Sequence, residues 1–96
     1  MNFDDYAEVA RGRGAMGFEV YQVTSTVVDG SRIDALRDDH LAYMADLEAS
    51  GKLMLAGPLS DAEGRDVADG CIILRAATMA EARGLAANDP MHKGGA

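Results

Sequence analysis

The chain has few of the residues that build aromatic cores or covalent cross-links. Its 96 residues contain no tryptophan, two phenylalanines, three tyrosines and one cysteine. A single cysteine excludes an intrachain disulfide. Cys71 lies in the apolar run Gly70-Cys71-Ile72-Ile73-Leu74, where a buried thiol is expected rather than a nucleophile, which needs a partly exposed, electropositive setting. Aliphatic side chains and methionine must therefore fill the interior.

Basic residues are scarce relative to acidic ones. Nine lysines and arginines stand against sixteen aspartates and glutamates, which gives a net charge of −7. Such a field repels polyanions, so we expect neither nucleic acid nor an anionic membrane as a partner. No apolar run approaches the ~18 residues of a membrane-spanning helix, and the first residues lack the basic-then-apolar pattern of a signal peptide. The composition therefore predicts a cytoplasmic protein.

Clusters that hold metals or cofactors are not evident in the sequence. Metal sites need three or four converging ligands, and two histidines and Cys71 supply no such cluster. The pairs Gly12-x-Gly14 and Gly94-Gly95 fit neither a phosphate loop nor a dinucleotide fingerprint, which both require a strand-to-helix setting. We therefore expect no metal and no cofactor.

The hydrophobic pattern predicts one α+β domain over residues 18–96, preceded by an N-terminal helical extension over residues 1–17. Gly12 and Gly14 should end the helix of the extension. Gly57-Pro58 is expected to end the second strand and to lead into a hairpin loop over residues 59–69. Alternation and β-branched content predict strands over residues 18–25, 52–56 and 71–77.

Capping residues mark the two helices of the domain. Ser31 fits the N-cap of the main helix, which should end at Gly51. Thr78 fits the N-cap of the second helix, which should end near Asn88 because the residue before a proline avoids the α region. The resulting order is a ferredoxin-like split βαβ unit that lacks its final strand. The first strand would then be an open edge, which the N-terminal helix or a partner chain would have to cover.

His40 and Asp89 are the residues best suited to chemistry. His40 lies on the apolar stripe of the main helix, four residues after Leu36. Asp89 ends the second helix before Pro90, and both helices of a split βαβ unit pack on one face of the sheet. An aspartate that accepts one ring proton leaves the other histidine nitrogen basic and oriented. The simpler alternatives are that His40 is a hydrogen-bonded core residue and that Asp89 only turns the chain.

The order of short motifs resembles that of the YciI-like (YCII-related domain) family over residues 18–95. This resemblance implies a ferredoxin-like fold that pairs into dimeric α+β barrels, and a catalytic dyad that corresponds here to His40 and Asp89. Family members continue after the Asp-Pro motif into a final strand that this sequence lacks. The resemblance therefore does not decide whether the barrel is complete or how its dimer interface forms. The motifs are Arg37-x-x-His40-x-x-Tyr43, Gly51-Lys52-Leu53, Ala56-Gly57-Pro58-Leu59-Ser60-Asp61, Gly64, Ala80-Glu81-Ala82-Arg83 and Asp89-Pro90-Met91.

The N-terminal extension resembles one branch of this family. Arg11-Gly12-Arg13-Gly14-Ala15 before Phe18-Glu19 is similar to the branch of chlorohydroxyhydroquinone dehydrochlorinases, which eliminate HCl from aromatic-pathway intermediates. The resemblance favours a cofactor-free lyase of this type, or an isomerase, working as a homodimer. The alternative is a non-catalytic domain of the same fold that binds a small ligand or serves as an accessory module.

Five further residues are candidates for substrate binding. Each also has a plainer interpretation: a strand-ending turn, a lone hydrogen-bond donor, core packing, or solvated surface charge. Arginine suits a phenolate or carboxylate because its guanidinium pairs with such anions. The candidates are Pro58, Ser60, Tyr43, Arg13 and His92.

Overall fold

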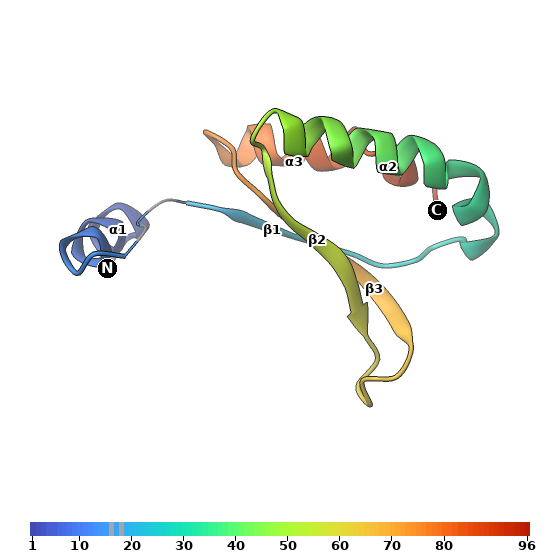
Figure 1. Ribbon diagram of the computed structural model, residues 1–96, viewed down its shortest axis with the longest axis horizontal. Helices are drawn as coiled ribbons and strands as arrows, with labels where there is room; N and C mark the ends of the chain where they lie inside the picture. The colour runs from blue at the N-terminus through green and yellow to red at the C-terminus, as the bar shows by residue number, and fades with distance from the viewer. Residues whose placement is uncertain (16, 18) are drawn as a thin grey trace.

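The computed structural model describes residues 1–15, 17 and 19–96, and it forms an α+β domain with a helix projecting from one end (Figure 1). Phe18, the first residue of the predicted strand, lies outside the described residues. The elements are α1 (Phe3–Gly12), β1 (Tyr21–Ser25), the 3₁₀ turn η1 (Gly30–Arg32), α2 (Ile33–Ala49), β2 (Leu53–Ser60), β3 (Val67–Leu74), α3 (Met79–Ala87) and α4 (Pro90–Lys93).

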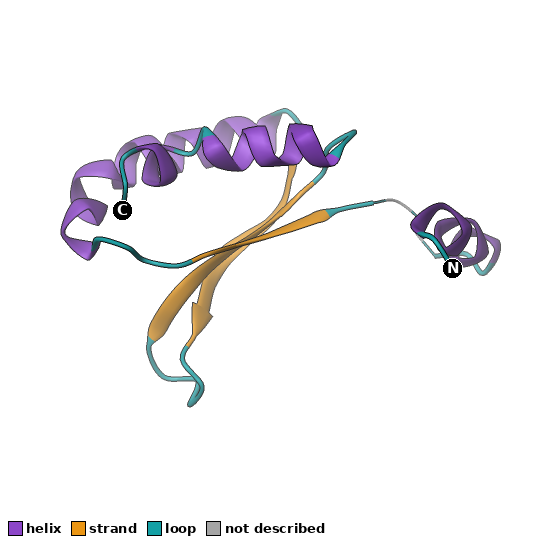
Figure 2. Ribbon diagram, turned by 180° about the vertical axis from the view of Figure 1, so that it is seen from behind, coloured by secondary structure: helices purple, strands orange, loops and turns teal. Residues whose placement is uncertain are grey.

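The described strands form one sheet in the order β1-β3-β2, in which both pairs are antiparallel. The helix α2 connects the two outer strands, and α3 follows the central strand. Figure 2 shows that α2 and α3 run side by side over one face of the sheet. This arrangement is the split βαβ unit. The predicted ferredoxin-like α+β class is confirmed.

The first strand is an edge, as the sequence predicts. Within the described sheet, β1 pairs only with β3. The helix α1 stands beyond the start of β1 (Figure 1) and does not run along the strand. A cavity of about 750 Å³ opens between α1, β1 and α3, lined among others by Tyr6, Val20 and Met79.

The core lies between α2 and the ends of β2 and β3. Met44, Leu47 and Leu74 are buried together, and Leu74 has no exposed surface. Met44 and Leu47 share one side of α2 because residues three apart are neighbours on a helix. Partly buried neighbours complete this core: Tyr21, Val23, Tyr43, Leu53, Ile72 and Leu85.

The hairpin strands are longer than the sequence pattern predicts. β2 continues through Gly57-Pro58 to Ser60, and β3 already begins at Val67, so the loop is shorter than the predicted 59–69. Pro58 is paired with Gly70 inside the ladder. A proline is tolerated there because β2 is an edge strand, where its missing N–H need not serve a neighbour. At its other end β3 stops at Leu74, before the predicted Ala77.

Of the two predicted N-cap residues, one caps its helix and the other does not. Thr78 caps α3 as predicted, since its hydroxyl oxygen accepts the N–H of Glu81 at 3.1 Å. Ser31 does not cap α2: its N–H and hydroxyl both donate to Asp29, which caps η1 instead. A carboxylate two residues upstream is the stronger acceptor, so residues 30–32 form the 3₁₀ turn and α2 starts at Ile33.

Candidate active site

His40 lies in the middle of α2, on the side that faces α4. Its apolar neighbours on the same stripe are Leu36 and Met44, one turn away in each direction. The imidazole is 25% exposed, so it is neither sealed in the core nor fully solvated.

Asp89 lies at the joint between α3 and α4. Its backbone is extended, with φ −60° and ψ 127°, because Pro90 follows it as the first residue of α4. Its carboxylate caps α4 by accepting the N–H of Met91 at 3.0 Å. Only 14% of its side chain is exposed. The sequence predicts no further element after the helix that should end near Asn88, whereas Pro90–Lys93 form this short capped helix.

The structure brings His40 and Asp89 together across 49 residues of sequence. Nδ1 of His40 lies 2.7 Å from Oδ1 and 3.0 Å from Oδ2 of Asp89. A carboxylate only accepts hydrogen bonds, so the network assigns the shared proton to Nδ1. In the neutral ring Nε2 then carries no proton and can act as a base. The catalytic role of the pair stays a prediction.

Tyr43 lies next to this pair, one turn after His40 on α2. Its hydroxyl donates to the carbonyl oxygen of Leu85 at 2.6 Å. Burial, and secondly the negative charge of Asp89, raises the pKa of the Tyr43 hydroxyl above its ordinary value. The phenol is therefore neutral, and its hydroxyl donates a hydrogen bond to the end of α3.

The other predicted substrate-binding residues come from β2, from the end of α1 and from α4. Ser60 and Pro58 are exposed on β2, and the Ser60 hydroxyl donates to the carbonyl of Asp61. Arg13 ends α1, at the opposite end of the molecule from α4 (Figure 1). His92 is exposed on α4, one turn after Asp89. Within the described residues, no hydrogen bond joins any of these four to the His40–Asp89 pair, and their roles stay predictions.

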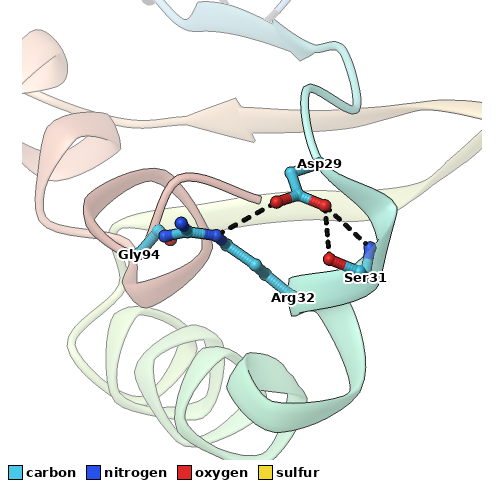
Figure 3. A network of polar contacts seen from close by, with 4 residues as sticks. All are labelled: Asp29, Ser31, Arg32 and Gly94. Atoms are coloured by element: carbon cyan, nitrogen blue, oxygen red, sulfur yellow. Dashed lines mark hydrogen bonds and ion pairs between the residues drawn. The ribbon is translucent and has the colours of Figure 1, made fainter.

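A second polar network, which the sequence reasoning missed, fixes the far end of α4 (Figure 3). Arg32 donates through Nε to Asp29 at 3.1 Å and through Nη1 to the carbonyl of Gly94 at 3.0 Å. Gly94 packs tightly, since a Cβ there would lie 2.4 Å from Leu36 and 2.9 Å from the Pro90 carbonyl. The Asp-Gly-Ser turn signal at Asp29 could have indicated the capped turn, but not its partner 62 residues away.

We expect Asp29→Asn to lower the free energy of unfolding near neutral pH and to make it less dependent on pH in acid. Hydrogen bonds from the Ser31 hydroxyl and N–H, and from Arg32, lower the pKa of Asp29 below its ordinary 3.8. A lowered folded-state pKa adds stability that is present above 3.8 and is lost as pH falls through the folded value. Urea unfolding between pH 7 and pH 2.5 should therefore show a smaller acid loss in Asp29→Asn. Identical pH dependence in the two proteins would contradict this network.

Two cavities flank α1 rather than the pair. The larger, about 930 Å³, is lined by charged residues that include Glu8, Arg11 and Glu81. Neither this cavity nor the one beside β1 is lined by His40 or Asp89. Among the residues that the structure describes, no cluster of three or more ligating side chains is placed to hold a metal ion. In the same part of the chain, no helix has the length and apolar character needed to cross a membrane.

Comparisons with known proteins fit this arrangement. The family profile of the YCII-related domain matches residues 16–96. The chain belongs to the YCII-related domain family. A solved structure of a 5-chloro-2-hydroxyhydroquinone dehydrochlorinase (TftG) from Burkholderia phenoliruptrix AC1100, in complex with 2,5-dihydroxybenzoquinone, is 28% identical with a TM-score of 0.63. The match covers 80% of this chain and 83% of that chain. No curated protein gives a significant match.

The predicted resemblance to the YCII-related family and to its dehydrochlorinase branch is confirmed by these matches. The similar structure is that of an enzyme with a bound small molecule.

Proposed function

We propose that this YCII-related protein is a cofactor-free lyase of the dehydrochlorinase type, or an isomerase, that acts on oxygenated aromatic-pathway intermediates in the cytoplasm. The 2.7 Å contact between His40 Nδ1 and Asp89 Oδ1 carries the proposal, because such a pair suits proton transfer. Similarity to a dehydrochlorinase supports the reaction class. Fold alone would not, since one fold serves many activities.

In this proposal His40 moves protons and Asp89 orients it. Asp89 keeps the proton on Nδ1, so Nε2 takes a proton from a ring hydroxyl and returns it to the carbon that carries chlorine. The ring is then a ketone with an sp³ C–Cl carbon. A second conjugated hydroxyl loses its proton to Nε2, its C–O bond becomes C=O, and the electron pair of the C–Cl bond leaves with chloride.

The sum of these steps is the loss of one proton and one chloride ion, which converts a chlorinated hydroxyhydroquinone into a hydroxyquinone. The ring is oxidised at the expense of the C–Cl bond, so the reaction consumes no external oxidant. An isomerase would use the first proton transfer alone. Both reactions need one base held at a defined place. His40 is that base, and Asp89 holds it in place.

Turnover of a substrate panel tests the proposal. Purified protein would be offered hydroxylated aromatics with and without ring chlorine, and chloride release and quinone absorbance would be followed. We expect chloride release from chlorinated hydroxyhydroquinones in step with quinone formation. Ligand binding without conversion of any compound would favour the non-catalytic alternative.

We further propose that the chain forms a homodimer through the sheet face opposite α2 and α3. The helices cover one face (Figure 2), and Ile73, next to the buried Leu74, points to the other. Leu55 is paired with Ile73 on that open face and is 65% exposed. Exposed apolar side chains on an uncovered sheet face support an interface there.

A single charge on this face should therefore disrupt the dimer. Leu55→Glu is expected to sediment as a monomer at concentrations where the wild type is a dimer. Leu41→Glu is the matched control. Leu41 is also an exposed leucine, but it lies on α2 and not on the open face of the sheet. A wild-type monomer, or a dimer that Leu55→Glu leaves intact, would contradict this interface.

A further inference from the structure

The end of α3 depends on a side chain from α2. The last carbonyls of an α-helix have no partner within the helix. Leu85 lies in the final turn of α3, and its carbonyl oxygen accepts the Tyr43 hydroxyl at 2.6 Å. Tyr43 therefore supplies from outside a hydrogen bond that the helix cannot make.

Backbone hydrogen bonds connect the end of α3 to Asp89. The N–H of Asn88 donates to the carbonyl of Gly84 at 3.1 Å, and the N–H of Asp89 donates to that of Ala86 at 3.3 Å. Asp89 is then fixed from the other side by capping α4. A shift at Leu85 is consequently passed on to the Asp89 carboxylate.

The same face of α2 contacts this joint at two points. Tyr43 follows His40 by three residues, which places both side chains one above the other on the helix. The hydroxyl of Tyr43 contacts Leu85, and the imidazole of His40 contacts Asp89 four residues later. The first contact sets the distance between α2 and the joint at which the second must form.

We propose that Tyr43 is a positioning residue that sets the place of the Asp89 carboxylate beside His40 by anchoring the end of α3. The proposal rests on the function proposed above for its effect on catalysis, and on the structure alone for its effect on the His40–Asp89 bond. It differs from the substrate-binding role that the sequence predicts for Tyr43, because the hydroxyl proton is already donated to Leu85.

Steady-state kinetics of Tyr43→Phe separate the two roles. The phenyl ring keeps its packing while the anchor is lost. A positioning role predicts that kcat falls roughly 10-fold while KM changes less than about twofold, since small misplacements cost rate rather than uniform binding. A raised KM with unchanged kcat would show a substrate contact and would overturn the proposal.

Thr78→Ala is the matched control. It removes a hydrogen bond at the opposite end of the same helix, the N-cap contact with Glu81. Its loss of stability should resemble that of Tyr43→Phe, and its kcat should stay at the wild-type value. An equal fall of kcat in both variants would show that general loosening of α3 is responsible, and would overturn the proposal.

A measurement that needs no substrate keeps the proposal testable if no compound is turned over. Proton NMR follows exchange with water of the His40 Nδ1 proton, which the bond to Asp89 protects. Tyr43→Phe should speed this exchange roughly fivefold, which corresponds to ~1 kcal/mol for one lost hydrogen bond, whereas Thr78→Ala should leave it unchanged. Exchange as slow in Tyr43→Phe as in the wild type would overturn the proposal even if the wild type is an active enzyme.

Discussion

Replacement of His40 by glutamine is expected to lower kcat/KM for chloride release by about 10²–10⁴-fold, the usual contribution of a positioned acid–base group. Glutamine keeps a polar, similarly sized side chain on α2 but has no nitrogen that takes up a proton at neutral pH. The fold should survive because His40 lies at the edge of the core, beside Met44 but outside the buried cluster. Chloride release by enzyme of verified secondary structure would measure the effect.

The matched control for this variant is Asp38→Asn. Asp38 is exposed on α2, two residues before His40. Its substitution changes the charge of the helix without altering either member of the His40–Asp89 pair. It should keep wild-type turnover. If His40→Gln and Asp38→Asn were equally active, His40 would be a structural histidine, and the lyase proposal would lose its base.

Replacement of Asp89 by asparagine should have the second large effect. We expect kcat/KM to fall by between about 10-fold and 1,000-fold. The amide has no negative charge to stabilise protonated His40 during the reaction. Its NH₂ group can also face Nδ1, which would move the ring proton to Nε2 and block the base. The measurement is chloride release together with the urea unfolding midpoint.

Asparagine separates the two tasks of Asp89. It is as good an N-cap as aspartate, so Asp89→Asn should keep the cap of α4 and unfold at nearly the wild-type urea concentration. Asp89→Ala removes the cap as well and should cost about 1 kcal/mol of stability. An active Asp89→Asn with an unstable Asp89→Ala would mean that Asp89 only caps α4.

The sequence predicts the site better than the outlines of the elements. His40 is placed by the apolar spacing of α2, and Asp89 by Pro90, because both signals are local and strong. The N-cap at Thr78 follows from its capping box in the same way. These features depend on residues within one or two turns of each other, which is the range that a sequence pattern reports.

The contact of His40 with Asp89 across 49 residues was expected from the split βαβ layout and the family resemblance, but other features that depend on distant contacts escaped prediction. Pro58 is a strand breaker by local preference, and only the position of β2 at the sheet edge makes it acceptable. The helix α4 has four residues, too few for a periodic pattern. The anchor from Tyr43 to Leu85 and that from Arg32 to Gly94 join segments 42 and 62 residues apart, which no local pattern encodes.

The proposed function requires that Asp89 holds the proton of His40 on Nδ1 and leaves Nε2 free as the base. Nitrogen-15 NMR of histidine-labelled protein reports this directly, with the exposed His92 as the internal comparison. We expect that the neutral His40 ring carries its proton on Nδ1 and that Asp89→Asn abolishes this preference. A His40 proton found on Nε2, or distributed as in Asp89→Asn, would contradict it.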